Sequence, residues 1–217
     1  MDAEDLDEAT YKAVVHDLAK VNTLTLARRP TLKFVARAVG NAAEFSVLDV
    51  GYGDGDMLRA IHKWAVKRGK LARLVGIDLN PRSRAAALEA TPAGMSIEWA
   101  VGDYVELAGQ GWNVIASSLV AHHMTHAQLV SFVRFMEAEA RDGWFINDLH
   151  RHGFAWLGFP LLATIMRWHP IVKHDGRLSI ARSYRPAEWP PILAEAGATG
   201  ADILRVFPFR LCVERRR

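Results

Sequence analysis

The segment Asp49-Val50-Gly51-Tyr52-Gly53-Asp54-Gly55-Asp56 constrains the fold more than any other part of the sequence. It follows a short apolar run, residues 45–50, which indicates a buried strand, and it precedes residues 57–67, whose apolar spacing predicts a helix. Glycines let the backbone turn sharply and approach a ligand closely, because no Cβ stands in the way. The helix N-terminus adds free N–H groups and a partial positive charge. The segment therefore predicts a strand–turn–helix unit that holds a ligand at its turn.

Strands and helices alternate after this turn. Asn80 is expected to cap the second helix, with Pro81 at its first helical position, and a third helix is expected at about residues 125–140. Further strands are expected at residues 71–77, 95–101, 114–119 and 144–147. This alternation predicts an α/β fold, in which helices cover both faces of a doubly wound, mostly parallel, seven-stranded Rossmann-like sheet.

The alternation of strands and helices weakens after Asp148, and residues 173–177 are interpreted as a polar break between apolar segments. Residues 186–196 predict a short helix that stops at Gly197. Residues 201–207 and 209–214 predict the last two strands, and their tight connection requires antiparallel neighbours.

The chain has 217 residues, enough for one domain with a substantial core. Helices are expected in the first 40 residues, where Leu18, Val21 and Leu24 recur at helical spacing. The expected parts are a helical N-terminal cap (1–44), a cofactor-binding core (45–148), an apolar substrate cap (149–185) and a C-terminal helix with a strand pair (186–217).

Charge and composition argue against several partners. The formal net charge is only +3, and no stripe of Lys and Arg with interleaved aromatics indicates nucleic-acid binding. The arginines at 215–217 are interpreted as a solvated tail. The single cysteine, Cys212, fits a reducing compartment, and the longest apolar stretch, residues 153–166, is too short to span a bilayer. We expect a cytoplasmic monomer or homodimer without stable membrane insertion.

The glycine turn discriminates between ligand classes. A dinucleotide site of the form G-x-G-x-x-G would need glycine where this chain has Asp56. Asp49 and Asp54 add negative charge that opposes a pyrophosphate, and no Gly-Lys-Ser/Thr follows to make a phosphate-binding P-loop. S-adenosylmethionine, by contrast, carries a sulfonium and an ammonium group and no phosphate. The acidic residues of this turn therefore favour it.

Four motifs at matching spacing carry a resemblance to a known family, which covers roughly residues 45–213. Asp49-x-Gly51-x-Gly53-x-Gly55 resembles the first motif of class I S-adenosylmethionine-dependent methyltransferases. Asp78 ends the second strand, and Gly102-Asp103-Tyr104 ends the third. The segment Ser117-Ser118-Leu119-Val120-Ala121-His122-His123 resembles the fourth-strand motif of the menaquinone and ubiquinone C-methyltransferase-like branch.

The resemblance implies a cofactor site. Asp78 would bind the ribose hydroxyls, Asp103 would meet the adenine amino group, and Tyr104 would cover the adenine ring. Tyr52 departs from the branch, which commonly has a small residue there, and we expect this ring to pack on the cofactor. The implied cofactor-binding residues are Asp49, Gly51, Tyr52, Gly53, Gly55, Asp56, Met57, Asp78, Leu79, Gly102, Asp103, Tyr104, Ser117 and Ser118.

Methyl transfer is an in-line displacement, so an enzyme mainly aligns the nucleophile and excludes water. A phenolic acceptor has a pKa near 10, and a nearby base would help at neutral pH. The candidate catalytic residues are His122, His123, His174 and Asp148. His122 and His126 share a helical spacing, but no local carboxylate or cysteine completes a metal set, so no metal is expected.

An apolar stretch, residues 154–168, predicts a closed hydrophobic acceptor pocket. We therefore expect O-methylation of a small aromatic, polyketide-like or lipid-tailed hydroxyl, of the kind found in secondary metabolism. The alternatives are C-methylation of a quinone-like ring, a nucleotide-binding oxidoreductase and a non-catalytic nucleotide-binding protein. Arg151, Arg167 and Lys173 leave open that the same stretch touches a membrane surface.

Overall fold

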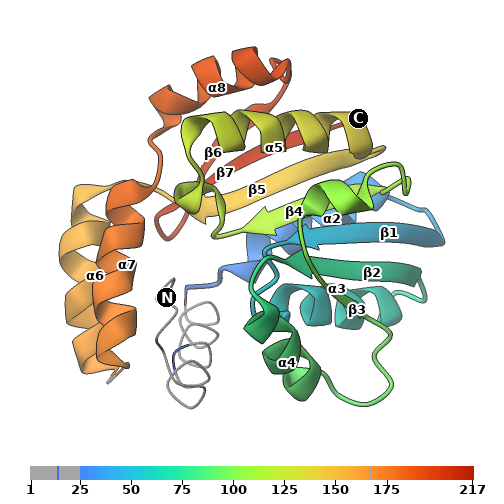
Figure 1. Ribbon diagram of the computed structural model, residues 1–217, viewed down its shortest axis with the longest axis horizontal. Coiled ribbons are helices and arrows are strands. Elements are labelled where there is room, and N and C mark those ends of the chain that lie inside the picture. Colours follow the sequence, from blue (N-terminus) through green and yellow to red (C-terminus); the bar gives the residue numbers. More distant parts are fainter. Residues whose placement is uncertain (1–13, 15–24, 167) are drawn as a thin grey trace.

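A seven-stranded sheet forms the centre of the molecule, with strand order β3-β2-β1-β4-β5-β7-β6 (Figure 1). The computed structural model describes Val14, residues 25–166 and residues 168–217. The strands are β1 (Glu44–Val50), β2 (Leu71–Asp78), β3 (Glu98–Val101), β4 (Val114–Ser118), β5 (Gly143–Leu149), β6 (Asp202–Val206) and β7 (Arg210–Arg216). The expected α/β class and sheet size are confirmed.

The first five strands are parallel and the last two are antiparallel. β1 lies between β2 and β4, and β5 follows β4, all in parallel register. β7 then inserts antiparallel between β5 and β6, which confirms the tightly connected C-terminal strand pair. Because the order reverses between β1 and β4, a crevice opens at the carboxyl ends of these strands, where such folds bind ligands.

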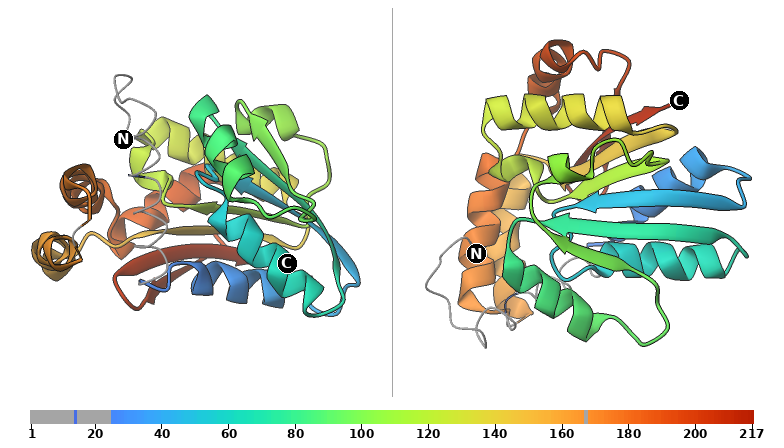
Figure 2. Two further views of the ribbon diagram at one scale, coloured as in Figure 1. Left: turned by 90° about the horizontal axis from the view of Figure 1, so that it is seen from below. Right: turned by 45° about the vertical axis from the view of Figure 1, so that its right-hand side comes forward.

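Helices cover both faces of the sheet (Figure 2). The α-helices are α2 (Arg28–Val39), α3 (Asp56–Val66), α4 (Pro81–Ala90), α5 (His126–Glu139), α6 (Gly153–Ile165), α7 (Pro170–Arg182) and α8 (Trp189–Ala196), and the short 3-10 helices are η1 (Tyr104–Leu107), η2 (Ala121–His123) and η3 (Pro186–Glu188). Side chains of α2, α3 and α4 form one core with the sheet, and those of α5 and α8 form another. Strand side chains such as Leu48 and Val47 are fully buried between these layers.

Several helix ends follow the expected chemistry. The Asn80 side chain accepts a hydrogen bond from the Arg82 N–H, with Pro81 at the first position of α4. Gly197 ends α8 in the left-handed conformation, with φ 78°. Because these signals depend only on neighbouring residues, the start of α4 and the end of α8 could be predicted from the sequence.

Three local expectations were wrong. Residues 173–177, expected as a polar break between apolar segments, lie inside α7, whose buried side is formed by Val172 and Ile180. The strand expected at 95–101 begins only at Glu98, after a turn in which the Met95 N–H donates to the Pro92 carbonyl. The arginines at 215–217 are not a solvated tail, because β7 extends to Arg216 and the last arginine binds the end of α5.

The hairpin of α6 and α7 lies beyond the carboxyl ends of the central strands (Figure 1). His150 and Tyr184 form a β-bridge at its base, and the Arg151 N–H donates to the Tyr184 carbonyl. This clamp fixes where the apolar segment leaves and rejoins the sheet. The helical stretch expected around Leu18, Val21 and Leu24 lies outside the described residues.

Among the described residues, no helix has both the length and the apolar character needed to cross a bilayer.

Candidate active site

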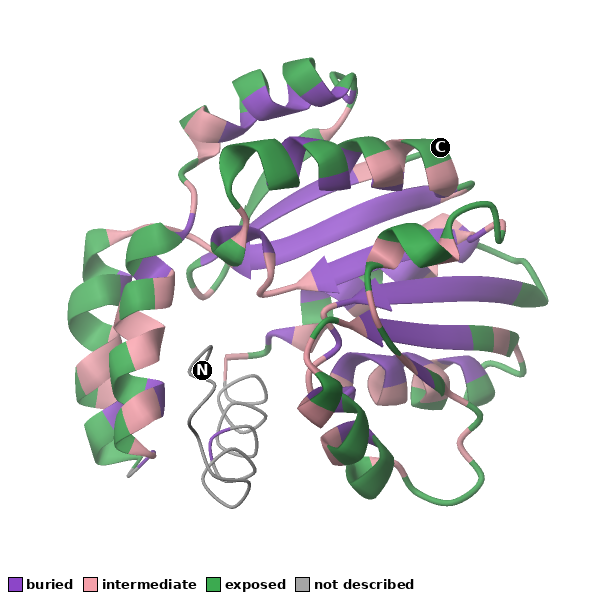
Figure 3. Cartoon of the chain, viewed as in Figure 1, coloured by how far each residue is buried: buried purple, intermediate pink, exposed green. Residues whose placement is uncertain are grey.

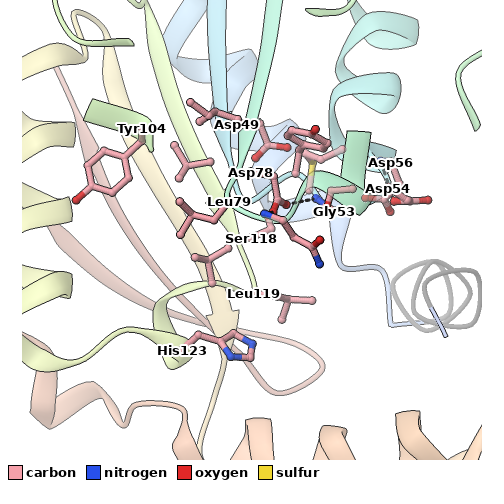
Figure 4. Close-up of a pocket in the computed structure, with 18 of the residues that line it drawn as sticks. Asp49, Gly53, Asp54, Asp56, Asp78, Leu79, Tyr104, Ser118, Leu119 and His123 are labelled. Atoms are coloured by element: carbon pink, nitrogen blue, oxygen red, sulfur yellow. Dashed lines mark hydrogen bonds between the residues drawn. The ribbon is translucent and has the colours of Figure 1, made fainter. Parts of the chain in front are cut away.

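A cavity of about 400 Å³ lies at the carboxyl ends of β1, β2 and β4. All of the predicted cofactor residues except Gly55 and Ser117 line it. In Figure 4 the side chains of Asp54 and Asp56 lie at one side of this cavity and Tyr104 at the other, while His123 lies near Leu119. The sequence motifs, which are up to tens of residues apart, therefore meet at one place.

The three loop glycines serve different purposes. A Cβ on Gly51 would lie 2.3 Å from the Val120 side chain, and one on Gly55 would lie 2.2 Å from the Trp99 ring. Gly53, with φ +57°, has no other residue within 4 Å of such a Cβ. Its N–H donates to Asp78 Oδ2 at 3.0 Å. Gly51 and Gly55 thus permit close packing within the protein, and Gly53 leaves open space at the cavity wall.

The Tyr52 ring is packed in the core. It is 4% exposed, and its centroid lies 4.8 Å from that of Trp99. On its other side the ring fills the space above Gly76, where a Cβ would approach it to 2.7 Å. These contacts account for a bulky side chain at this position without requiring that it pack on a cofactor.

Carboxylates give the cavity its charge. Asp49 is 2% exposed, and its Oδ1 has no hydrogen-bond partner among the described residues. Burial raises the pKa of Asp49 well above its usual range, and the neighbouring charges of Asp56 and Asp78 raise it further. Burial and Asp54 likewise raise the pKa of Asp56 to about 6. Such carboxylates favour a ligand that brings positive charge into the site.

Asp78 connects the glycine loop to the start of α4. Its Oδ2 accepts the Gly53 N–H, and its Oδ1 accepts the Asn80 N–H at 2.9 Å. Each carboxylate oxygen has a second lone pair, so both retain acceptor capacity toward the cavity that Asp78 lines. This geometry suits a ligand with two adjacent hydroxyl groups.

The far side of the cavity combines an aromatic ring with polar atoms. Tyr104 packs against Phe132 and Phe135 of α5, with centroids 4.9 and 4.8 Å away. Asp103 caps η1 through the Val105 N–H. Leu79, Gly102 and Met57 complete this part of the lining.

The two serines at the end of β4 differ. Ser117 is buried and donates to the Val50 carbonyl at 2.9 Å, so it joins β4 to β1 and does not line the cavity. Ser118 lines the cavity, and its hydroxyl has no hydrogen-bond partner among the described residues.

A buried histidine–aspartate pair lies beside the cavity. Asp148 Oδ1 is 2.7 Å from His122 Nδ1, and Asp148 Oδ2 accepts the His122 backbone N–H at 2.9 Å. Burial raises the pKa of Asp148, but His122 and the hydrogen bonds it accepts outweigh this and hold the pKa below its usual value. His122 Nε2 is buried without a hydrogen-bond partner among the described residues. A carboxylate that orients a histidine in this way is typical of general bases.

The other histidines lie in different surroundings. His123 lines the cavity, and its ring centroid is 4.1 Å from that of His122. His174, which lies 3.5 Å from Asp175, has a side chain that is 75% exposed on α7, and it does not line the cavity. His126 pairs with Glu195 at 2.7 Å rather than converging with His122. Within the described ranges, no group of three or more His, Cys, Asp or Glu side chains is placed to hold a metal.

Two arginines in the cavity wall were not identified from the sequence. Arg28 lies 3.8 Å from Asp56. Arg210, on β7, is 3% exposed, and its Nη1 has no hydrogen-bond partner within the part of the chain that the structure describes. Burial lowers the pKa of Arg210, against the opposing effects of Asp148, Cys212 and Asp56. Nothing in the local sequence distinguishes Arg210 from the chain's many surface arginines, so only its burial shows that it belongs to the site.

Comparison with known proteins identifies this arrangement. Residues 47–143 match the family model described as a methyltransferase domain. The matched residues, which make up less than half of the chain, are similar to a methyltransferase domain. The matched residues contain the glycine loop, the ends of β2 and β3 and the fourth-strand motif, so the match and the cavity coincide. No curated protein matches this chain by sequence.

Solved structures share the fold of this chain at low sequence identity. Human N-acetylserotonin methyltransferase, solved with S-adenosylmethionine, superimposes with a TM-score of 0.67 and 13% identity over 100% of this chain. This chain spans only 60% of the length of that enzyme. The plantazolicin methyltransferase BamL has a TM-score of 0.66 and 15% identity, over 88% of this chain and 70% of its own. A methyltransferase from Aquifex aeolicus has a TM-score of 0.61 and 17% identity, over 97% of this chain and 98% of its own.

Proposed function

We propose that this chain is an S-adenosylmethionine-dependent methyltransferase that methylates a hydroxyl oxygen of a small hydrophobic acceptor, and that His122 removes the hydroxyl proton. The observation that carries the proposal is the buried His122–Asp148 pair, whose Nε2 has no hydrogen-bond partner in the described part of the chain. A buried polar atom without a partner is costly, and the hydroxyl of an acceptor would satisfy it. The His122 ring lies against the ring of His123, which lines the cavity, so the pair is close to the space for ligands.

Asp148 positions the base in this proposal. The pKa of Asp148 lies below its usual range, so the side chain is ionised at neutral pH. Its carboxylate therefore accepts a hydrogen bond from the N–H at His122 Nδ1. This fixes the tautomer in which Nε2 carries the lone pair, as in other carboxylate-oriented histidines. After proton transfer, the same carboxylate stabilises the imidazolium.

The cofactor fits the other end of the cavity. Asp78 has free acceptor capacity for the ribose hydroxyls, and Asp103 and Tyr104 lie where the adenine would sit. Asp49 and Asp56 would face the positively charged part of the cofactor, which relieves their buried charge. When bound, S-adenosylmethionine supplies a methyl group activated by its sulfonium.

The acceptor side is apolar with one cation. Leu119, Val120 and Met124 line it beside His123, whereas no described residue of the hairpin of α6 and α7 is part of the lining. Arg210 adds a buried guanidinium that would bind a carbonyl or phenolate oxygen of the acceptor. These features favour an oxygenated aromatic or polyketide-like molecule over a peptide or a nucleic acid.

The test is turnover with S-adenosylmethionine and a panel of phenols, hydroxylated polyketides and quinols. Mass spectrometry of the products detects the added methyl group, and NMR assigns it to oxygen or carbon. We expect His122→Gln to lower kcat by about 10²- to 10⁴-fold, the range of general base catalysis, with unchanged affinity for S-adenosylhomocysteine. Asp148→Asn should lower kcat as well, because the amide favours the wrong tautomer.

His126→Gln is the matched control and should keep full kcat, since it changes a histidine that pairs with Glu195 outside the cavity and leaves the buried pair intact. Full activity of His122→Gln, or methylation at a ring carbon, would contradict the proposal. Cofactor binding without turnover of any acceptor would instead favour a non-catalytic binding protein.

A further inference from the structure

Helix α6 exposes an apolar face. Phe154, Leu157, Leu161 and Ile165 follow one another at helical spacing and are 75%, 66%, 65% and 67% exposed. Figure 3 shows the exposed positions along this helix, which lies at the outer edge of the molecule. The helix contains no charged residue. A continuous apolar face of this kind usually marks an interaction site.

The opposite face of α6 already has its core. Ala163 is buried in a small cluster with Trp168 and Val172, and Phe159 packs against that cluster. Gly176 of α7 lies so close to the Phe159 ring that a Cβ there would approach it to 2.1 Å. The outward face is therefore not needed to hold the hairpin together.

The apolar face continues onto the turn between β6 and β7. The His152 ring lies between Phe154 and Phe209, with centroids 5.6 and 5.3 Å away. Phe209 is 41% exposed, and Phe207 in the same turn is 86% exposed. We call the surface formed by Phe154, Leu157, Leu161, Ile165, Phe207 and Phe209 the apolar strip.

Positive charge borders the apolar strip. Arg205 is exposed on β6, two residues before Phe207 of the apolar strip. Lys173 of α7 donates to Thr164 Oγ1 of α6 at 2.8 Å, which places its charge at the surface of the hairpin. Arg177 of α7 lies over the ring of Trp156 on α6, 4.0 Å from its centroid, whereas Arg151 at the base of the hairpin is paired with Glu188. The face therefore combines an apolar centre with a cationic border.

We propose that the apolar strip docks on a bilayer that contains anionic phospholipids, with its side chains in the boundary between headgroups and acyl chains. Apolar residues flanked by Lys and Arg are the pattern of peripheral membrane binding, in which buried apolar area and attraction to anionic lipids add. A second copy of this chain fits less well, because two cationic borders would repel each other. This interaction does not depend on which acceptor is methylated.

Co-sedimentation with vesicles tests the proposal. We expect the full chain to sediment with vesicles of phosphatidylcholine plus phosphatidylglycerol, to sediment far less with phosphatidylcholine alone, and to be released by salt. The double variant Leu157→Glu, Leu161→Glu should bind anionic vesicles about tenfold or more weakly, because it removes two apolar side chains and adds two repelled charges. Arg205→Glu should weaken binding through charge alone.

The matched control is Val66→Glu with Leu71→Glu, which are 63% and 66% exposed but lie on α3 and β2. These changes should leave vesicle binding as it is, and circular dichroism checks that all variants keep the fold. Equal binding of both double variants, or no binding of the wild-type chain to anionic vesicles, overturns the proposal. So does a wild-type dimer in light scattering that becomes a monomer in Leu157→Glu, Leu161→Glu, since the strip would then be a protein interface.

Discussion

Replacing Asp56 by Asn should make the protein more stable and weaken its binding of the cofactor. Asp56 stands at the start of α3 with a side chain that is 12% exposed. Burial and the neighbouring Asp54 raise its pKa from 3.8 to about 6, even though Arg28 and Arg59 oppose the rise. The ionised side chain is therefore destabilising in the folded state, and asparagine has nearly the same shape without the charge.

The size of the effect follows from the pKa difference. A rise from 3.8 to about 6 is roughly 2 units, or about 3 kcal/mol of unfolding free energy at about pH 8, where the carboxylate is ionised in both states. Because the folded pKa is raised, this loss of stability disappears as the pH falls. The gain from Asn should thus drop to about half at about pH 5 and vanish near pH 3.

Urea unfolding followed by tryptophan fluorescence at about pH 8 and about pH 5 measures this difference. A gain of about 3 kcal/mol corresponds to a rise in Tm of roughly 6–12 °C for a chain of this length. Asp202→Asn is the control, since Asp202 is an exposed carboxylate on β6. No gain at the higher pH, or an equal gain at both, would refute the reasoning about the buried charge.

The same variant has a functional readout that does not depend on stability. If Asp56 faces the cationic part of the cofactor, Asp56→Asn should bind S-adenosylmethionine more weakly in calorimetry at about pH 8. Wild-type affinity should itself fall as the pH drops below about 6, where Asp56 takes up its proton. Affinity that is flat across this range would remove Asp56 from the cofactor site.

Asp78→Ala should weaken binding of S-adenosylhomocysteine by about 1–3 kcal/mol, because it removes a charged acceptor and frees the Gly53 N–H; unchanged affinity in calorimetry would count against the ribose role. Gly55→Ala should lower the unfolding free energy by about 1–3 kcal/mol in urea titration, since its Cβ would press into Trp99, and wild-type stability would mean that the loop yields easily. Gly53→Ala should lower the unfolding free energy by only about 1 kcal/mol, because of its positive φ, yet weaken cofactor binding. A larger loss of stability in Gly53→Ala than in Gly55→Ala, with cofactor binding weakened only in Gly55→Ala, would contradict these roles. Arg210→Met should raise KM for an oxygenated acceptor about tenfold or more in steady-state kinetics while cofactor affinity stays close to wild type, and an effect on the cofactor alone would place Arg210 on the other ligand.

The prediction of a polar interruption at residues 173–177 shows where sequence patterns mislead. Lys173 and His174 lie on the outer face of α7, where polar side chains contact water, so they do not interrupt the helix. Val172, Gly176 and Ile180, spaced by four residues, make its inner face. That spacing, with Pro170 at the first helical position, was the available signal.

The sequence by itself determined the strands and helices that surround the predicted cofactor site. Apolar runs ending in glycine or aspartate, the Asn80-Pro81 helix start and the Gly197 stop are local features, because backbone conformation and capping depend on a few neighbouring residues. The common edge of parallel strands then brought the motif residues together without further information.

Only the tertiary structure decided how the site is completed. It showed that Gly55 makes room for Trp99 and that Asp148 holds His122, from a distance of 26 residues in sequence. It also buried Arg210 in the cavity wall, among many arginines with the same local appearance. Such pairings arise from the packing of distant elements, and no local pattern of side chains encodes which charge or ring will face which.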